Sequence, residues 1–462
     1  MSVTPFEFAR AHNERFITEL EQFLRIPSIS TLSEYAEDVS RAAKWLENHL
    51  QAIGLQNVAV YSTDGHPIVY GEWCGVPEAP TLLFYGHYDV QPVDPLDQWH
   101  SPPFEPVVQE GKIFARGATD DKGQVFLVLK AIEAWLATKG ALPCNVKLLL
   151  EGEEEIGSPN LPDFLRANTE RLSCDAVLIC DTAMAAEDVP SLVYGLRGLA
   201  YLELSVYGPR RDLHSGSYGG AVVNPANALA GIIAALHDEQ GRVAVPGFYD
   251  DVVPLSEEER ALLRMLPFDE EAFRTELGVD ALGGEKGYTV VERIGARPTL
   301  DVNGMWSGFI GEGAKTVLPA VAHAKISMRL VPNQRADHIA HLVAQRIEQL
   351  APTGVRVQVR LLHGADPVII DRRSFAMEAA AQALEATFGR PAVWQREGGS
   401  IPVVTEFQRI FGVPVVLMGF GLHTDGAHSP NEHFHLKNFS RGIEAVVRFF
   451  AELSQRAALY AP

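Results

Sequence analysis

The residues best suited to chemistry in this sequence are imidazoles and carboxylates that follow apolar runs. Such runs, bounded by turn residues, are typical of buried strands in a parallel sheet, whose carboxyl ends meet at one edge. Two imidazoles and several carboxylates at that edge would form a mixed nitrogen and oxygen site suited to Zn²⁺, or to Mn²⁺ or Co²⁺. The set consists of His87, Glu154, Glu155, Asp181 and His428 after apolar runs, and Asp120 before a predicted helix.

The charge of this set also favours bound cations. Carboxylates that crowd together repel one another and their pKa values rise, whereas two divalent cations would neutralise them. Asp89 lies two residues after His87, on the same side of the strand, and could orient the imidazole. The sequence therefore predicts a metal centre in which Asp89 supports a ligand.

Each of these residues also has an ordinary structural interpretation. A single His or Asp at a strand end is more often a loop or capping residue, and the acidic stretch 151–155 alone would be a solvated turn. The stretch 313–316 lacks the Gly-Lys-Thr join and the strand-to-helix context of a phosphate loop. Three further histidines near His428 are predicted to be loop residues: His423, His433 and His435. Only the shared position of the set makes the metal interpretation specific.

The elements that must position these residues alternate between strands and helices. Such alternation predicts an α/β fold with a mostly parallel sheet and helical crossovers. The predicted buried strands are 81–84, 146–150, 176–180 and 413–418, with shorter strands at 58–61 and 68–70. The predicted helices are 4–24, 37–53, 123–138, 374–388, 401–411 and 439–455, and the stretch 91–116 is predicted to be a loop.

A different pattern occupies the middle of the chain. Three strands alternate apolar and polar residues, and two helices accompany them, which is typical of an α+β domain on an antiparallel sheet. The strands are 202–206, 324–330 and 355–361, and the helices are 225–238 and 335–350. The acidic stretch 253–287 gives no clear pattern. We therefore expect residues 1–196 and 371–462 to form one discontinuous domain, with residues 197–370 inserted as a second.

Bulk properties limit the classes of function. A chain of 462 residues exceeds one ordinary hydrophobic core, and its formal charge of −20 argues against nucleic-acid or anionic-membrane partners. No apolar run is long enough to span a bilayer, and no signal-peptide pattern opens the sequence. The four cysteines lack Cys-x-x-Cys spacing, which suits free thiols in a reducing compartment. We expect a soluble cytoplasmic protein.

Taken together, the motifs resemble the dinuclear-metal exopeptidases, a family that includes acetylornithine deacetylase, succinyl-diaminopimelate desuccinylase, aminoacylase and glutamate carboxypeptidase. The motifs are His-Tyr-Asp-Val at 87–90, Arg-Gly-Ala-Thr-Asp-Asp-Lys-Gly at 116–123, Glu-Gly-Glu-Glu-Glu-Ile-Gly-Ser at 151–158 and Gly-Ala-His-Ser-Pro-Asn-Glu at 426–432. Further stretches at 211–216, 315–319, 327–332 and 396–402 most resemble the carnosinase-type dipeptidase branch. The similarity covers nearly the whole chain.

The resemblance implies a role for each residue of the catalytic domain. Asp120 would bridge two divalent ions, most simply Zn²⁺, and Glu154 would be the general base. His87 and Asp181 would complete the ligands of one ion, and Glu155 and His428 those of the other. The resemblance also implies a cis peptide bond between Asp120 and Asp121.

The resemblance gives the inserted domain a lid and dimerisation role. His214 would stabilise the developing oxyanion from the partner subunit, which implies a homodimer. Arg329, Thr316 and Ser400 would hold the terminal carboxylate of the substrate, and Arg suits a bidentate grip on it.

The function implied is hydrolysis of the peptide bond in dipeptides or short peptides, by a water that Glu154 activates. An N-acyl-amino-acid deacylase could use the same residues on an amide. A non-catalytic metal- or amino-acid-binding protein is an alternative of another class, but such a protein would have no need of a general base at Glu154.

Overall fold

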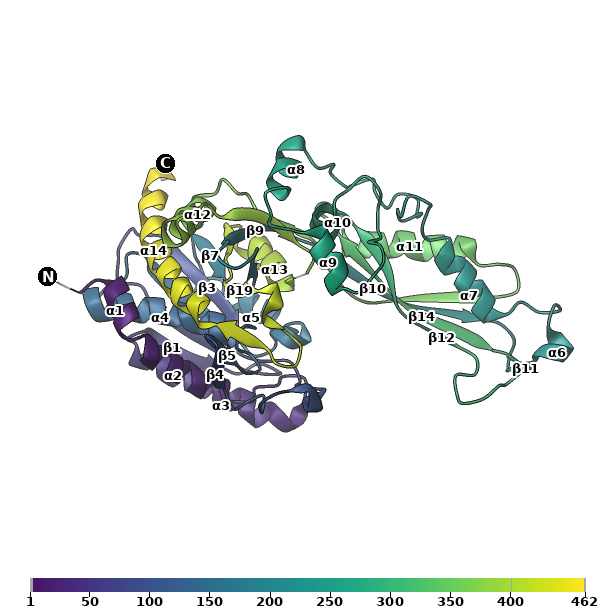
Figure 1. The fold of residues 1–462 in the computed structure, drawn as a ribbon, viewed down its shortest axis with the longest axis horizontal. Helices are drawn as coiled ribbons and strands as arrows, with labels where there is room; N and C mark the ends of the chain where they lie inside the picture. The colour runs from purple at the N-terminus through teal and green to yellow at the C-terminus, as the bar shows by residue number, and fades with distance from the viewer. Residues whose placement is uncertain (1–2, 400, 461–462) are drawn as a thin grey trace. The chain divides into compact units, whose positions relative to one another are not determined.

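The computed structural model describes residues 3–399 and 401–460 and divides the chain into two compact units. The first unit contains Met1–Tyr194, Ile370–Gln395 and Val403–Pro462. The second contains Gly195–Ile369 and Arg396–Pro402, so its sequence is inserted into that of the first (Figure 1).

The first unit is built on a mixed sheet with the strand order β1-β2-β6-β3-β7-β18-β9-β16, and β17 also pairs with β9. The four central strands β6, β3, β7 and β18 are parallel, as predicted, whereas the flanking pairs are antiparallel. The bounds are β1 Gln56–Tyr61, β2 Ile68–Trp73, β3 Thr81–His87, β6 Asn145–Glu151, β7 Ala176–Ile179, β9 Ser191–Leu196, β16 Val368–Ile369, β17 Val393–Glu397 and β18 Val415–Leu417. Near-continuous apolar sequence suits the central strands because helices cover both faces.

Helices pack on both faces of this sheet. On β3, Tyr85 contacts Phe407 of α13, while a Cβ at the next residue, Gly86, would lie 2.5 Å from Val125 of α4. Successive residues of a strand point to opposite faces, so α13 and α4 lie on opposite sides. The helices are α1 Pro5–Ala11, α2 Asn13–Leu24, α3 Ala36–Ala52, α4 Lys122–Lys139, α5 Leu161–Ala167, α12 Phe375–Phe388, α13 Pro402–Phe411 and α14 Leu436–Tyr460.

The N-terminal helix differs from its prediction. Thr4 and Glu7 form a capping box at its start, but the expected single helix is divided into α1 and α2 at His12. His12 has φ −108° and ψ 11°, outside helical geometry, and its Nδ1 lies 2.8 Å from the carbonyl oxygen of Phe8. A side chain that bonds the preceding turn offers the backbone an alternative to the helix.

A small three-stranded sheet corrects two loop predictions. β4 (Val107–Gln109) and β5 (Lys112–Phe114) form a hairpin within the expected loop 91–116, and β20 (His433–His435) pairs with β5. The turn places Glu110 and Gly111 at φ 52° and 75°, as a two-residue hairpin requires. His433 and His435 are therefore strand residues. Strands of three residues are too short for their alternation to stand out in a sequence.

The second unit has the antiparallel sheet order β12-β14-β10-β15, as its alternating pattern predicts. Its strands are β10 Gly198–Tyr207, β12 Thr299–Ser307, β14 Val321–Leu330 and β15 Arg356–Ala365. α7 (Pro225–Ala234) and α11 (Ala336–Leu350) bury one face of the sheet (Figure 1). The unassigned acidic stretch contains two short helices, α8 (Glu257–Leu263) and α9 (Glu270–Glu276), and α10 (Val290–Ala296) follows it.

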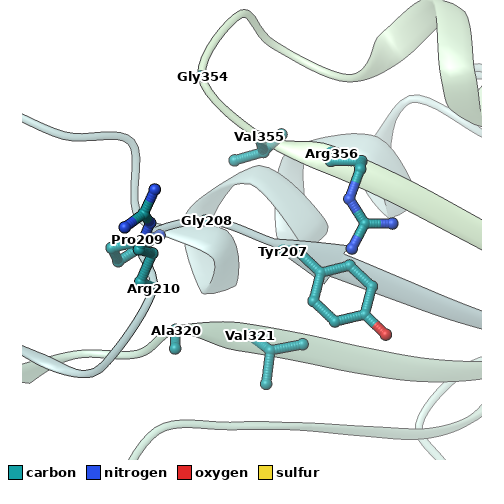
Figure 2. A pocket seen from close by; sticks show the side chains of 9 residues that line it. All are labelled: Tyr207, Gly208, Pro209, Arg210, Ala320, Val321, Gly354, Val355 and Arg356. Carbon is teal, nitrogen blue, oxygen red and sulfur yellow. The ribbon is translucent and has the colours of Figure 1, made fainter.

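A pocket of about 500 Å³ opens beside the end of this second sheet (Figure 2). Its lining includes Tyr207 and Arg356, whose guanidinium lies 4.2 Å from the tyrosine ring centre. Because none of its nine lining residues is His, Cys, Asp or Glu, the pocket cannot hold a metal through side chains of those types.

No helix within residues 3–399 and 401–460 is both long enough and apolar enough to cross a bilayer.

Candidate dinuclear metal site

The carboxyl ends of the central strands bring the predicted metal-type residues to one edge of the sheet. His87 ends β3, a 3₁₀ turn after β6 carries Glu154 and Glu155, and Asp181 follows β7. Asp120 precedes α4, and His428 comes from the loop before β20. The peptide bond between Asp120 and Asp121 is cis, which confirms the expectation from the resemblance.

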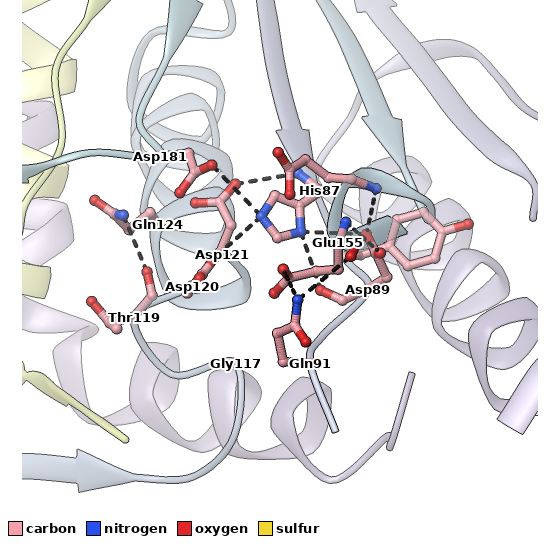
Figure 3. A network of polar contacts seen from close by, with 12 residues as sticks. His87, Asp89, Gln91, Gly117, Thr119, Asp120, Asp121, Gln124, Glu155 and Asp181 are labelled. Carbon is pink, nitrogen blue, oxygen red and sulfur yellow. Dashed lines mark hydrogen bonds and ion pairs between the residues drawn. The ribbon is translucent and has the colours of Figure 1, made fainter. Parts of the chain in front are cut away.

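The five candidate ligands form two groups that share Asp120. In one group, Nε2 of His87 lies 3.1 Å from Oδ1 of Asp120 and 3.7 Å from Oδ2 of Asp181 (Figure 3). In the other, Nε2 of His428 lies 2.9 Å from Oδ2 of Asp120 and 3.3 Å from Oε2 of Glu155. The two oxygens of a single carboxylate therefore face two separate sets of donors, which is the arrangement that a bridging ligand needs.

Asp89 supports both sides of this arrangement. Its carboxylate lies 3.3 Å from Nδ1 of His87, and it accepts hydrogen bonds from the backbone N–H groups of Glu154, at 3.2 Å, and Glu155, at 3.1 Å. Its expected contact with His87 is present, and its hold on the glutamate turn is an addition that the sequence did not suggest. Gln91, also missed, donates from Nε2 to Oε2 of Glu155 at 2.8 Å. Gln91 could have been suspected from the sequence, because it lies two residues after Asp89.

Glu432 is a further residue that the sequence analysis did not single out. Its buried carboxylate accepts hydrogen bonds from the backbone N–H groups of Gly117, Thr119 and Asp120, at 3.0 to 3.1 Å. It also pairs with the guanidinium of Arg116 at 2.8 Å. These contacts tie the segment that carries Asp120 to the segment that carries His428. Arg116 and Glu432 both lie inside the motifs given above, so the sequence could have suggested that they matter to the site.

Burial and mutual repulsion perturb the carboxylates as expected. Burial, followed by the charge of Asp120, raises the pKa of Asp181 to about 7. Burial raises the pKa of Glu154 well above its ordinary value, and the charges of Asp181, Glu155 and Asp120 act in the same direction. Asp120 is the exception, because hydrogen bonds from His428 and His87 outweigh its burial and lower its pKa.

The imidazoles respond in the opposite sense. Hydrogen bonds to Asp120 and Glu155 raise the pKa of His428 to about 10. Burial alone would lower the pKa of His87, but the carboxylates of Asp120 and Asp89 raise it well above its ordinary value. Protons on the two imidazoles thus replace part of the positive charge that the cluster requires, and divalent cations fit the same donor set.

Of the four residues predicted to act on the substrate, the structure describes three, all of them in the second unit. His214 lies in β11 (Leu213–His214), which pairs with β13 (Val317–Leu318), and Thr316 directly precedes β13. The backbone N–H of Ser215 donates to the carbonyl of Thr316 at 3.1 Å, so His214 and Thr316 are neighbours in one short arm. Arg329 is a half-buried residue of β14, and Ser400 lies outside the described residues.

Arg197 is a second guanidinium in the neighbourhood of Arg329 that sequence reasoning missed. Burial, followed by the charge of Arg329, lowers the pKa of Arg197 to about 10. Its position two residues after the expected change of pattern near Gly195 gave no chemical signal. The carboxylate of Asp301 acts on both arginines and raises their pKa values, against the effect of burial.

Comparison with known proteins identifies the family. The model of peptidase family M20/M25/M40 matches residues 83–452. The chain is 32% identical to the Cys-Gly metallodipeptidase dug1 of Schizosaccharomyces pombe, over 97% of this chain and 98% of that protein. It is 30% identical to the human Beta-Ala-His dipeptidase, over 97% of this chain and 92% of that protein.

Solved structures agree in fold. Human carnosine dipeptidase 1 matches with a TM-score of 0.84 and 30% identity over 98% of both chains. An M20 family metallo-carboxypeptidase from Sulfolobus solfataricus matches with a TM-score of 0.85 and 34% identity, over 95% of this chain and 99% of that one. The predicted fold class and dipeptidase branch are therefore confirmed. The chain belongs to peptidase family M20/M25/M40 and is a metal-dependent peptidase.

Proposed function

We propose that the protein is a dinuclear metallo-dipeptidase that uses water to cleave the peptide bond of a dipeptide or short peptide. The observation that supports this most directly is the sharing of Asp120 between two groups of donors. Glu154 directly precedes the proposed ligand Glu155, and the charges of His87, Asp181 and Glu155 act on its pKa.

The first unit is the catalytic domain in this proposal, and it would hold two divalent ions. His87, Asp120 and Asp181 would bind one, and Asp120, Glu155 and His428 the other. Two imidazoles and three carboxylates form a donor set that suits Zn²⁺, with Mn²⁺ or Co²⁺ as alternatives. When bound, such a pair of cations acidifies water and polarises a carbonyl group.

Glu154 is the proposed general base and acid. Its carboxylate takes a proton from the water whose oxygen attacks the carbonyl carbon, and it then gives a proton to the leaving amine as the C–N bond breaks. A positioned group of this kind contributes roughly 10²–10⁴-fold to the rate. Asp89 holds the backbone of Glu154 in place and leaves its carboxylate available for this proton transfer.

The second unit is the proposed lid and dimerisation domain, and it would hold the substrate. The backbone N–H of Gly216 donates to Nδ1 of His214 at 3.0 Å, so neutral His214 carries its proton on Nε2 and can donate it to an oxyanion. We assign this contact to the partner subunit of a homodimer. Arg329 would bind the terminal carboxylate with Thr316 and Ser400, and Arg197 would add a second positive charge.

A substrate panel tests the proposed activity. Zinc-loaded protein should hydrolyse Cys-Gly, β-Ala-His and other dipeptides faster than N-acetyl or N-succinyl amino acids. Tripeptides distinguish a strict dipeptidase from a carboxypeptidase, which would remove their last residue equally well. Turnover confined to the acyl compounds would overturn the dipeptidase assignment in favour of a deacylase. Binding without turnover of any compound would favour a non-catalytic binding protein.

We also propose that the enzyme works in the cytoplasm. Its four cysteines are all free thiols, two of them buried, which suits a reducing compartment.

A further inference from the structure

A second cluster of metal-type side chains lies in the first unit, apart from the five proposed ligands. It consists of Asp425, at the end of the turn after β19 (Gly421–Leu422), and His433 and His435 of β20. Nε2 of each histidine lies 3.6 Å from the same oxygen, Oδ1 of Asp425. The two imidazoles extend from the same face of β20, because they are two residues apart in a strand.

The carboxylate at the centre of this cluster is only half satisfied. Asp425 is fully buried. Its Oδ2 accepts hydrogen bonds from the backbone N–H of Leu422 at 2.9 Å and from the hydroxyl of Thr119 at 3.4 Å. Its Oδ1 has no hydrogen-bond partner among the described residues. A buried polar atom without a partner is costly, and this one faces two imidazole nitrogens.

His433 is held as a metal ligand would be. Nδ1 of His433 lies 3.0 Å from the carbonyl oxygen of Asn431 and so donates to it, which leaves a lone pair on the Nε2 that faces Asp425. A backbone carbonyl on the far nitrogen is the usual support of a metal-bound histidine. Burial lowers the pKa of both His433 and His435, which favours the neutral form that a metal ligand requires.

A positive charge already lies beside this cluster. Nζ of Lys112, on the neighbouring strand β5, is 3.2 Å from Nε2 of His433. Lys112 and His435 are directly paired across the two strands. An ammonium group on a flexible stem can move aside for a better cation, so Lys112 marks the place where positive charge is favoured and would compete with a metal for it.

We propose that Asp425, His433 and His435 bind a third divalent cation of the zinc class, distinct from the two of the proposed active site. Zinc bonds of roughly 2.1 Å place neighbouring tetrahedral ligands about 3.4 Å apart, close to the 3.6 Å between Oδ1 of Asp425 and each histidine nitrogen. Two imidazoles and one carboxylate leave the fourth position to water. Asp425 lies three residues before His428 and contacts Thr119, which is next to Asp120. The third ion would therefore stabilise the two segments that carry the proposed ligands His428 and Asp120.

Zinc counting on the full chain tests this proposal. Protein dialysed against excess Zn²⁺ and passed through gel filtration should retain three equivalents per chain, measured by elemental analysis. His435→Gln should retain two, whereas the control His341→Gln, which removes an exposed imidazole from α11, should retain three. Lys112→Gln leaves all three ligands in place and should tighten the third equivalent by about tenfold or more, because it removes a competing charge.

Zinc anomalous scattering from crystals locates the ion directly, and a peak between Asp425 and His435 is expected. A wild-type map without a peak at this position would overturn the proposal, as would a zinc content that His435→Gln does not lower. Since dipeptide hydrolysis is not among the readouts, these results are independent of the proposed function.

Discussion

Asp120 carries the strongest constraint among the single residues of the site. Each of its two oxygens lies within about 3 Å of a different histidine, and its own backbone N–H is held by Glu432. Its pKa is lowered whereas the pKa values of Asp181 and Glu154 are raised, so Asp120 is more firmly ionised than either of them. That property suits a ligand shared by two cations.

Replacing Glu154 by Gln separates catalysis from metal binding. The variant keeps all five proposed ligands but cannot accept a proton, so kcat for a dipeptide should fall by roughly 10²–10⁴-fold. Metal content, measured by elemental analysis, should stay at the wild-type value. Glu170→Gln, which removes an exposed carboxylate, is the matched control and should keep full activity. Unchanged turnover in Glu154→Gln would rule out the proposed base.

His87, Glu155 and Asp181 could be predicted as ligands from the sequence because each follows a buried strand within a few residues. The prediction of His87 and Asp181 did not depend on contacts between distant parts of the chain. Gln91, Glu432 and Arg197 escaped prediction because each acts through a contact that only the fold creates. Glu432, for example, meets Asp120 across 312 positions of sequence.

At the scale of elements, long periodic segments were predictable and short ones were not. The four central strands and the long helices lie close to their expected ranges because burial sets their apolar patterns. β4, β5 and β20 have three residues each, and β12 is a mostly exposed edge strand, so none has a clear pattern. The break between α1 and α2 depends on the contact of one side chain, His12.

The Arg116–Glu432 pair should control how well the loops of the site are held. Glu432→Gln leaves a buried guanidinium without its counter-ion and weakens three backbone hydrogen bonds. The free energy of unfolding should fall by about 3–5 kcal/mol. Urea unfolding followed by circular dichroism measures this loss.

The surface pair Arg10–Glu444 gives the control for that experiment. It joins α1 to α14 through an arginine side chain that is 67% exposed, so Glu444→Gln should stay within about 1 kcal/mol of the wild type. If the free energy of unfolding falls equally in Glu432→Gln and Glu444→Gln, the burial of the Arg116–Glu432 pair makes no difference to its contribution to stability.

His49 on α3 should make the first unit sensitive to acid. Burial, followed by the charge of Lys130, lowers its pKa from 6.5 to about 3. Because the unfolded chain binds the proton more readily, stability present above pH 6.5 is lost as the pH falls toward 3. Between pH 7 and pH 5 the loss should be at most about 2 kcal/mol.

Urea unfolding at pH 7 and pH 5 measures the contribution of His49. His49→Gln should show a smaller loss between the two pH values than the wild type, whatever its absolute stability. His341→Gln, on the surface of α11, should keep the wild-type loss. A loss in His49→Gln equal to that of the wild type would assign the acid sensitivity to other groups.

At the scale of the whole molecule, the first unit is proposed to bind the metal ions and the second unit to bind the substrate. His214 and Thr316 lie together on the β11–β13 arm of the second unit, whereas every proposed metal ligand belongs to the first unit. The sequence predicted each residue separately through the resemblance. Their closeness depends on the pairing of β11 with β13, two strands about a hundred residues apart in sequence, and this pairing could not be predicted from the sequence.

Mixed dimers test whether His214 acts across subunits. His214→Ala and Glu154→Gln subunits should each be nearly inactive alone. In a heterodimer, one of the two sites combines an intact Glu154 with an intact His214 from the partner, so about half of the wild-type activity per dimer should return in purified heterodimers. No recovery in verified heterodimers would place His214 in the same subunit as the site it serves, or outside catalysis.

The central claim is that five side chains from distant parts of the chain hold two cations through a shared Asp120. The most direct measurement is anomalous scattering from crystals grown with Zn²⁺ and a non-hydrolysed dipeptide analogue. We predict two strong peaks about 3.5–4 Å apart, one beside His87 and Asp181 and the other beside Glu155 and His428, with Asp120 between them. A single peak, or none among these residues at saturating zinc, would contradict the account.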